Sequence, residues 1–263
     1  MRLDLYLVQN ELYESRNKAA AAVKDGCFTV NGKLVTKPAF EIGEHDVVKA
    51  AKEATVYVAR SAHKLLRAFC LFSLNCKDKV AADLGASTGG FCQVLLENDI
   101  KKIYAVDIGT AQLHPTVKND CRVVNMEHTN ARYLTKDSFP EPIQFLTADL
   151  SFISLKAILP AIAQTIADDG EAIILVKPQF EAGPAHLSKR GVVLDRKVHV
   201  AVLNDITAFA QNLGFAICGL SFSGLAGESG NREYLLYLNK SATPSIDISA
   251  AVKSAVYLEE SNA

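Results

Sequence analysis

The stretch that most constrains the fold is Lys79–Phe91, with the sequence KVAADLGASTGGF. A short apolar run ends at Asp83, passes into a glycine-rich turn and continues into Gln93–Leu96, which is typical of a helix. This order predicts a strand, a tight loop and a helix N-terminus. A ligand could approach the backbone closely at the glycines of the turn, and the first amides of the helix would face it. These glycines are Gly85, Gly89 and Gly90.

A second predicted strand, Ile103–Val106, ends at Asp107, about twenty residues after the turn, where an acid can bond ribose hydroxyls. The pattern here is D-x-G-x-x-x-G-G with Ser87 inside it, which departs from the dinucleotide fingerprint G-x-G-x-x-G. The carboxylate of Asp83 would repel a pyrophosphate and attract a cationic amino-acid tail. We therefore predict a site for S-adenosylmethionine, which carries an ammonium and a sulfonium.

The composition limits the class of protein. A chain of 263 residues with 49% hydrophobic residues can form one large domain and a small one. The net charge of −1 means that any contact with nucleic acid must come from local basic patches. The six cysteines form no C-x-x-C pair, so neither zinc nor a disulfide framework is predicted. Without a signal peptide or an apolar stretch of ~20 residues, we expect a cytoplasmic protein with no membrane span and no metal.

The first fifty residues predict a small module of two helices and a hairpin. The second helix pattern opens at Ser15 and closes at Gly26. Asn31-Gly32 then lies between the apolar runs Phe28–Val30 and Leu34-Val35, which is a strong hairpin signal. Such a module is too small to be an enzyme by itself.

The patterns R-x-D-x-x-L, S-R-x-x-A and G-x-x-x-V-N-G-x-x-V-x-x-P in this module resemble the RNA-binding domain of the ribosomal protein S-four type. The resemblance implies that basic side chains of the module contact RNA phosphates. The alternative is that these residues only form solvated helix faces, since acids and bases balance here. The candidates are Arg2, Arg16, Lys18 and Lys33.

The rest of the chain alternates strand and helix patterns, which predicts an α/β fold with a doubly wound sheet and a terminal antiparallel pair. A helix is expected over Leu203–Leu213, and a further helix pattern, Asp247–Leu258, is interpreted as a surface or frayed helix without a role. The further strands are predicted at Val123–Asn125, Ile143–Leu146, Ala172–Val176, Ile217–Phe222 and Tyr234–Leu238.

Four charged residues are predicted to meet at one rim of this sheet. Asp149 and Lys177 follow the carboxyl ends of two strands, where α/β proteins bind ligands. Glu233 begins the last strand and reaches the same rim if that strand runs antiparallel. Lys64 lies on a predicted helix, with Ser61 as its N-cap, that precedes the first strand of the sheet.

This set suits methyl transfer to a hydroxyl. A ribose 2′-hydroxyl is a poor nucleophile and needs a base, and a lysine serves as a base when burial or a second cation lowers its pKa toward ~7–8. We assign Lys177 as the base and Lys64 either as the second cation that lowers its pKa or as the residue that positions the ribose, with Asp149 and Glu233 orienting the ammonium groups. The alternative is that these are four unrelated surface charges.

Longer motifs identify a family resemblance. The segments D-x-G-A-S-T-G-G-F, A-V-D-I-G, M-E-H-T-N-A-R, A-D-L-S-F-I-S-L, L-V-K-P-Q-F-E and G-N-R-E-Y resemble the TlyA family. The resemblance implies a class I, Rossmann-like methyltransferase with a seven-stranded sheet. It also implies methylation of the 2′-hydroxyl of cytidine in ribosomal RNA, usually of the large subunit and in some members also of the small subunit. The implied domains are RNA-binding at 1–50, a linker at 51–56, methyltransferase at 57–240 and a tail at 241–263.

The resemblance also assigns site residues. The Lys-Asp-Lys-Glu catalytic set of the family falls on Lys64, Asp149, Lys177 and Glu233. The family usually has R-G-G-x-K-L where this chain has R-S-A-H-K-L, which reduces backbone freedom at Ser61-Ala62 before Lys64. The residues expected to bind the cofactor are Asp83, Gly85, Ser87, Gly89, Gly90, Asp107 and Glu127, the last of them near the adenine.

A basic connection follows the fifth predicted strand of the sheet. Within Pro178–Asp195, the side chains of Lys189 and Arg190 are expected to contact the RNA backbone, unless the segment is only a flexible solvated loop. Three other functions remain as alternatives. A non-catalytic RNA-binding shell would not need the acid–base set, and haemolysin-like membrane damage has no amphipathic cationic helix to support it. Base N-methylation would favour [D/N]-P-P-[Y/F] in place of Asp149–Phe152.

Overall fold

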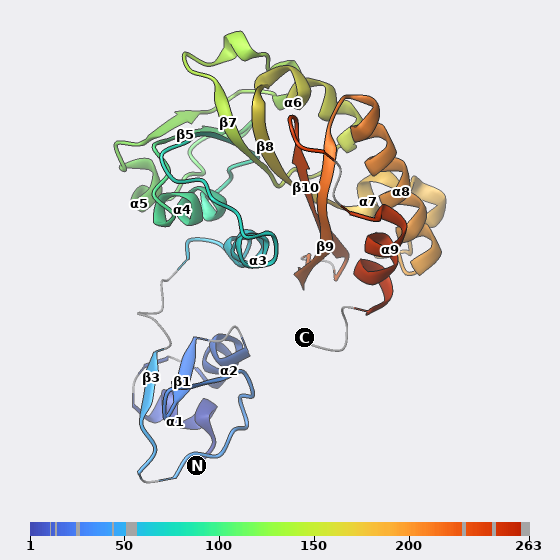
Figure 1. The fold of residues 1–263 in the computed structure, drawn as a ribbon. Helices are drawn as coiled ribbons and strands as arrows, with labels where there is room; N and C mark the ends of the chain where they lie inside the picture. Colours follow the sequence, from blue (N-terminus) through green and yellow to red (C-terminus); the bar gives the residue numbers. More distant parts are fainter. Residues whose placement is uncertain are drawn as a thin grey trace. The chain divides into compact units, whose positions relative to one another are not determined.

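The computed structural model describes residues 1–10, 12–13, 15–24, 27–43, 45–50, 57–227, 230–243 and 246–258. The chain forms two compact units, Met1–Val56 and Tyr57–Ala263 (Figure 1). The predicted helix end at Gly26 and the predicted linker at 51–56 lie outside the described residues.

The N-terminal unit packs two helices on a small antiparallel sheet with the strand order β2-β1-β3. Its helices are α1 (Leu3–Gln9) and α2 (Arg16–Lys24), and its strands are β1 (Phe28–Val30), β2 (Lys33–Val35) and β3 (Val48–Ala50). The predicted hairpin is confirmed, because β1 pairs with β2 around a turn in which Asn31 and Gly32 both have positive φ. Strand β3, which pairs with the other edge of β1, was not predicted.

The second unit contains a seven-stranded sheet with the order β6-β5-β4-β7-β8-β10-β9. Its strands are β4 (Val80–Leu84), β5 (Lys102–Val106), β6 (Val123–Met126), β7 (Ile143–Ala148), β8 (Ile166–Val176), β9 (Ala216–Ala226) and β10 (Arg232–Asn239). The pairings from β6 through β8 are parallel, whereas β10 is antiparallel to both of its neighbours. The predicted doubly wound sheet with a terminal antiparallel element is confirmed.

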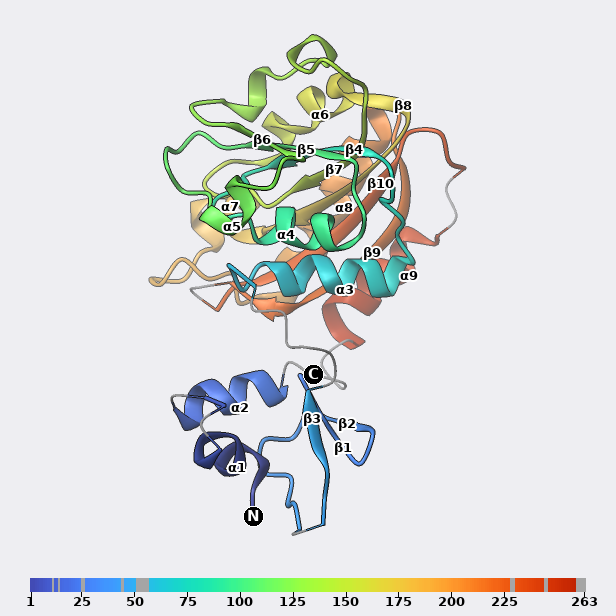
Figure 2. The same ribbon diagram turned by 90° about the vertical axis from the view of Figure 1, so that its left-hand side faces the viewer.

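Helices cover both faces of this sheet, and α3 and α4 lie side by side on one of them (Figure 2). Helices α6, α8 and α9 cover the other face (Figure 1). The helices are α3 (Ala62–Phe72), α4 (Gly90–Glu97), α5 (Pro115–Lys118), α6 (Leu159–Thr165), α7 (Pro178–Glu181), α8 (Arg196–Asn212) and α9 (Ile248–Lys253). Shorter helical turns are η1 (Ala131–Tyr133), η2 (Lys136–Ser138), η3 (Leu155–Ala157), η4 (Pro184–His186) and η5 (Ser254–Leu258).

The central strands are apolar along their whole length because both faces of the sheet are covered. All five residues of β4 are buried, including Asp83. The apolar side chains of the sheet separate into two clusters, one beneath α3 and α4 and one beneath α6, α8 and α9. This packing fixes the carboxyl ends of the strands, where the predicted site lies.

Three local expectations differ from the structure. Helix α8 begins at Arg196 rather than Leu203, because the carboxylate of Asp195 accepts a hydrogen bond from the Lys197 amide and caps it. Ser61 occupies the N-cap position of α3 in a helical conformation and makes no side-chain cap. The C-terminal segment is not a frayed surface helix, because the side chains of Val252, Ala255 and Val256 are buried against the second cluster.

Candidate active site

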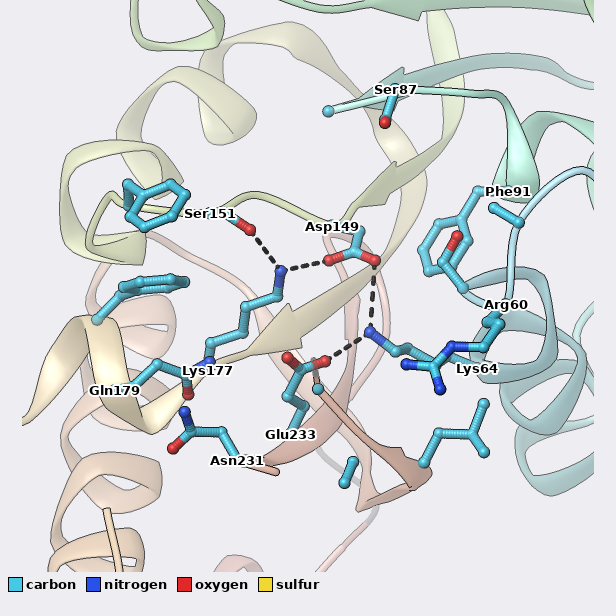
Figure 3. A pocket seen from close by; sticks show the side chains of 18 of the residues that line it. Arg60, Lys64, Ser87, Phe91, Asp149, Ser151, Lys177, Gln179, Asn231 and Glu233 are labelled. Atoms are coloured by element: carbon cyan, nitrogen blue, oxygen red, sulfur yellow. Dashed lines mark hydrogen bonds and ion pairs between the residues drawn. The ribbon is translucent and has the colours of Figure 1, made fainter. Parts of the chain in front are cut away.

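A pocket of about 790 Å³ opens at the carboxyl ends of the parallel strands. Its walls come from the segment before α3, the turn after β4, the ends of β7 and β8, the connection before α8 and the beginning of β10. The side chains of Lys64, Asp149, Lys177 and Glu233 all line it (Figure 3). The structure therefore brings together four residues that are far apart in the sequence.

These four side chains form one continuous chain of ion pairs. Lys177 Nζ lies 2.6 Å from Asp149 Oδ1, and Lys64 Nζ lies 3.6 Å from Asp149 Oδ2 and 2.6 Å from Glu233 Oε2. Lys177 also donates a hydrogen bond of 2.9 Å to the hydroxyl of Ser151 (Figure 3). The lysines are only 8% and 7% exposed, and lysine is rarely so buried unless it is paired. Opposite charges alternate along the chain, so each buried ammonium is compensated.

The sheet topology explains why these residues meet. Asp149 and Lys177 follow the carboxyl ends of β7 and β8, which are parallel neighbours. Glu233 is the second residue of β10, and because β10 runs antiparallel to β8, its beginning lies at the same rim. Lys64 comes from the first turn of α3, which packs against β9 and β10.

The glycine-rich turn lies directly beside this set. Gly85 has a φ of +81°, and a Cβ atom there would lie 2.7 Å from the carbonyl oxygen of Asp149, so another residue would displace the end of β7. The carboxylate of Asp83, which also lines the pocket, accepts hydrogen bonds from Thr147 Oγ1 and Cys92 Sγ. Burial raises the pKa of Asp83 to about 6.

The other residues predicted to bind the cofactor lie around this turn. Ser87 lines the pocket, and its amide donates to Asp107 Oδ2, while Asp107 Oδ1 accepts from the Gly109 amide. Glu127 accepts from the Ala111 amide, and a hydrogen bond from Asn125 is the main reason why its pKa is lowered. Gly89 and Gly90 form the N-terminus of α4. Like Asp107 and Glu127, these two glycines are not among the described residues that line the pocket.

Comparison with known proteins places this fold and pocket in a family. The model of FtsJ-like methyltransferases matches residues 57–240, and that of the S4 domain matches residues 1–48. The 16S/23S rRNA (cytidine-2′-O)-methyltransferase TlyA of Mycobacterium tuberculosis is 37% identical over 238 residues, which cover 90% of this chain and 89% of TlyA. The chain is a member of the TlyA family of FtsJ-like methyltransferases.

Two further relatives support this membership. YqxC of Bacillus subtilis, named as a candidate rRNA methyltransferase, is 41% identical over 90% of this chain and 85% of YqxC. A solved structure from Streptococcus thermophilus, named as a candidate hemolysin, has a TM-score of 0.73 and 40% identity, covering 97% of this chain and 94% of that one. The suspected resemblance to the TlyA family is thus confirmed.

In this TlyA-family chain, the basic connection before α8 reaches the pocket. The turn at its tip is closed by the amide of Gly191, which donates to the Ser188 carbonyl, and Arg190 lines the pocket. The buried side chain of Asn231 anchors this turn, because it donates to the Gly191 carbonyl at 3.0 Å and accepts from the Val193 amide at 3.1 Å. Asn231 lies two residues before Glu233, so the turn is tied to the charged set.

Sequence reasoning missed two aromatic side chains at the rim. Phe152 and Phe180 both line the pocket, with ring centroids 5.2 Å apart. Phe152 is 91% exposed and has a φ of +61°, an uncommon conformation for a bulky residue. The carboxylate of Glu181 holds this loop by accepting from Ser154 Oγ and the Leu155 amide. The only sequence signal was their position, close to Asp149 and Lys177 in two of the long family motifs.

Arg60, Ser151 and Asn231 also line the pocket and were not predicted as functional residues. Ser151 and Asn231 lie inside two of the long family motifs, but their contacts are with Lys177, Gly191 and Val193, so no pattern within those motifs marks their roles. Arg60, which is exposed, comes from the segment before α3, whereas Arg190 comes from the connection before α8. It therefore adds a second arginine to the pocket.

In the S4-like unit, two of the predicted RNA contacts surround a buried acid. Arg2 donates to both carboxylate oxygens of Asp4, at 3.0 and 2.8 Å, and Arg16 donates to one of them at 3.1 Å. These arginines lower the pKa of Asp4, the contact with Arg2 being the largest cause. Lys33 is exposed on β2 and Lys18 lies in α2, with its side chain outside the described part of the structure.

None of the helices in the described segments is long and apolar enough to cross a membrane. Within the same segments, no group of three or more histidine, cysteine, aspartate or glutamate residues could hold a metal ion.

Proposed function

We propose that this protein transfers a methyl group from S-adenosylmethionine to the ribose 2′-hydroxyl of a cytidine in ribosomal RNA. The observation that carries the proposal is the buried chain of alternating ammonium and carboxylate groups beside the glycine-rich turn. The relatives named as rRNA (cytidine-2′-O)-methyltransferases support the choice of substrate. We infer the large subunit as the first target and the small subunit as a second.

The charged set supports proton removal from the hydroxyl. We assign the base to Lys177, because its amine is held by a single carboxylate and a hydroxyl. Lys64 contacts two carboxylates, those of Asp149 and Glu233, and is therefore better suited to remain an ammonium that holds the ribose. Asp149 contacts both lysines, so it fixes the distance between the base and the cation.

The residues of the turn suit the proposed cofactor. The buried carboxylate of Asp83 provides a negative charge for the cationic amino-acid end of S-adenosylmethionine, and Gly85 brings the turn against Asp149. The acid Asp107, after β5, lies where class I folds hold a ribose. When bound, S-adenosylmethionine supplies a methyl group on a sulfonium sulfur that keeps the electron pair of the broken bond.

The outer parts of the molecule support an RNA substrate. An exposed aromatic side chain such as Phe152 can stack on a base that has left its helix, and Phe180 extends the same surface. Arg60 and Arg190 can contact phosphates on either side of the target nucleotide. The S4-like unit adds the positions of Arg2, Arg16, Lys18 and Lys33 as a second RNA-binding surface.

The test is methyl transfer to ribosomal subunits that lack the modification. Purified protein, S-adenosylmethionine labelled in its methyl group, and each subunit separately would be incubated, and the RNA digested to nucleosides. We expect label in 2′-O-methylcytidine from the large subunit. Label on a base, or no label on either subunit, would overturn the proposal. Label on a ribose other than that of cytidine would overturn the assigned nucleotide alone.

A further inference from the structure

We propose that Ser151 is a positioning residue that aims the lone pair of Lys177 at the ribose hydroxyl. This inference rests on the function proposed above. Among the described residues, the Lys177 ammonium contacts two oxygen atoms at close range, Asp149 Oδ1 at 2.6 Å and Ser151 Oγ at 2.9 Å. Both partners come from the loop that follows β7, and both line the pocket.

The geometry of an amine determines where the lone pair of Lys177 can point. A lysine nitrogen has three directions besides its bond to carbon, and in the neutral form two carry hydrogens and one carries the lone pair. Asp149 is an acceptor when ionised, and the Ser151 hydroxyl oxygen can accept as well. In the structure Lys177 donates to Ser151 Oγ, and the adjacent Asp149 Oδ1 is a buried oxygen without a hydrogen bond, so it can accept a second hydrogen when the amine turns toward it. The third direction is then left for the lone pair. Because Lys177 lines the pocket, an incoming hydroxyl can meet that lone pair.

With one of the two acceptors removed, the amine would rotate about its carbon–nitrogen bond. Asp149 alone fixes one hydrogen and leaves the other hydrogen and the lone pair free to exchange places. Proton transfer needs a donor and an acceptor in hydrogen-bonding geometry, so a rotating lone pair would be correctly aimed for only part of the time. Lys64 differs, because its two close partners are both carboxylates.

The loop that carries Ser151 is built to hold such a position. Ser154 Oγ and the Leu155 amide both donate to the carboxylate of Glu181, at 2.6 and 2.7 Å. Glu181 belongs to α7, which begins directly after Lys177, so the base and its serine partner are attached to one tied unit. Phe152, next to Ser151, keeps its strained φ of +61° in this loop.

In the proposed step, the 2′-oxygen forms a new bond to the methyl carbon as the bond between that carbon and the sulfonium sulfur breaks, and the sulfur keeps the electron pair. The proton of the hydroxyl passes to the amine of Lys177, which becomes an ammonium. Ser151 gains and loses no proton, because it accepts a hydrogen bond from Lys177 before and after the transfer. The proton then leaves to solvent when the product departs.

Besides Lys177, the charged groups that line the pocket are Arg60, Lys64, Asp83, Asp149, Arg190 and Glu233.

The experiment compares Ser151→Ala with Ser151→Thr in the full-length protein. Single-turnover methyl transfer to unmodified ribosomal subunits would be measured from neutral to alkaline pH, with S-adenosylmethionine and RNA binding measured separately. We expect Ser151→Ala to be about tenfold slower, with both affinities within about twofold of the wild type. Ser151→Thr keeps the hydroxyl on an exposed residue and should restore most of the rate.

The pH profile separates aiming from ionisation. If Ser151 acted only by changing how readily Lys177 loses its proton, the deficit of Ser151→Ala would vanish on the alkaline plateau, where the base is already neutral. We expect the deficit to persist there. A vanishing deficit, a Thr variant as slow as the Ala variant, or a parallel loss of RNA affinity would each overturn the positioning role. If the wild type transfers no methyl to a 2′-oxygen, the proposed function fails first, and this inference fails with it.

Discussion

At the scale of single residues, the two pocket lysines differ in the groups that contact their ammonium groups. Lys64 is held between two carboxylates, whereas Lys177 is held between one carboxylate and one hydroxyl. This difference is the physical basis for assigning different roles to two residues of the same type.

Replacing Lys177 with alanine should abolish methyl transfer. General-base catalysis contributes about 10²–10⁴ in rate, so single-turnover transfer should fall by at least a hundredfold. Binding of S-adenosylmethionine, measured by calorimetry, should change by less than about threefold. Lys253→Ala, which alters an exposed lysine of α9, serves as the control and should retain its activity. Near-normal turnover in the Lys177 variant would exclude this residue as the base.

Replacing Asp83 with asparagine should stabilise the fold in a pH-dependent way. The pKa of Asp83 is about 6 in the folded chain and near 3.8 when unfolded. Between these values only the folded chain holds the proton, so stability decreases as the pH rises from about 4 to 6 and stays lower above that. Asp83→Asn removes this pH dependence, so the stability of the variant relative to the wild type should be higher at pH 8 than at pH 4 by about 3 kcal/mol.

Thermal unfolding of both proteins across this pH range checks the prediction. A gain that is equal at pH 4 and pH 8 would show that burial of the Asp83 charge is not its cause. The same variant should bind S-adenosylmethionine more weakly, because it lacks the carboxylate that we propose to face the cationic end of the cofactor. The destabilising acid would then be retained for binding, a common trade between stability and function.

At the scale of elements, one side chain ties the basic connection to β10. Asn231 uses both polar atoms of its side chain on this connection, at Gly191 and Val193. His199 donates at the same place, from its Nε2 atom to the carbonyl oxygen of Val193 at 2.9 Å. Since a carbonyl only accepts, Nε2 of His199 carries the hydrogen, and Val193 is held at both its amide and its carbonyl.

Replacing Asn231 with alanine should loosen this connection. The Val193 amide and the Gly191 carbonyl would each lose a partner, at a cost of about 1–3 kcal/mol per buried group. Amide hydrogen exchange at residues 188–193 should become faster, and the KM for ribosomal RNA should rise by about tenfold. Asn212→Ala, at an exposed position ending α8, is the matched control. Unchanged exchange at residues 188–193 would contradict the anchoring role.

The elements that sequence predicted best are those with a local cause. The hairpin of β1 and β2 follows from Asn31-Gly32, and β4 with α4 follows from an apolar run that ends in glycines. Strand β3 has three residues and owes its existence to pairing with β1, so no local pattern predicts it. The C-terminal helix is short, and its buried face packs against α8 and β9, which lie far from it in any local sequence pattern.

The charged set could be predicted because two of its members follow the ends of apolar strands. Asp149 and Lys177 come directly after predicted strands, and a topological rule brings such ends together. Ser151, Phe152 and Asn231 could not be predicted in the same way. Their significance depends on hydrogen bonds and ring contacts between distant segments. A sequence by itself contains no distances of that kind.

At the scale of the whole molecule, the chain is built of two units with separate cores. The N-terminal unit has its own apolar cluster, which includes Leu3, Leu7 and Phe28. The cofactor turn and the charged set all belong to the second unit. This separation predicts that RNA binding and cofactor binding can be lost independently.

Removing residues 1–56 should therefore leave cofactor binding intact. We expect the remaining chain to unfold cooperatively and to bind S-adenosylmethionine within about threefold of the full-length protein. Methyl transfer to ribosomal subunits should fall by at least about tenfold, because the phosphate contacts of the first unit are lost. Thermal unfolding, calorimetry and labelled transfer measure these three properties. Full transfer by the shortened protein would rule out an RNA-binding role for the first unit.

The hydrogen bond between Lys64 and Glu233 joins positions 169 residues apart. During synthesis, the RNA-binding unit and the glycine-rich turn leave the ribosome long before β10, which must insert between β8 and β9. The RNA-binding unit of a nascent chain can thus bind RNA well before Glu233 is in place beside Lys64. Because Glu233 lies on the last strand, the charged set of the enzyme is complete only when translation is nearly finished.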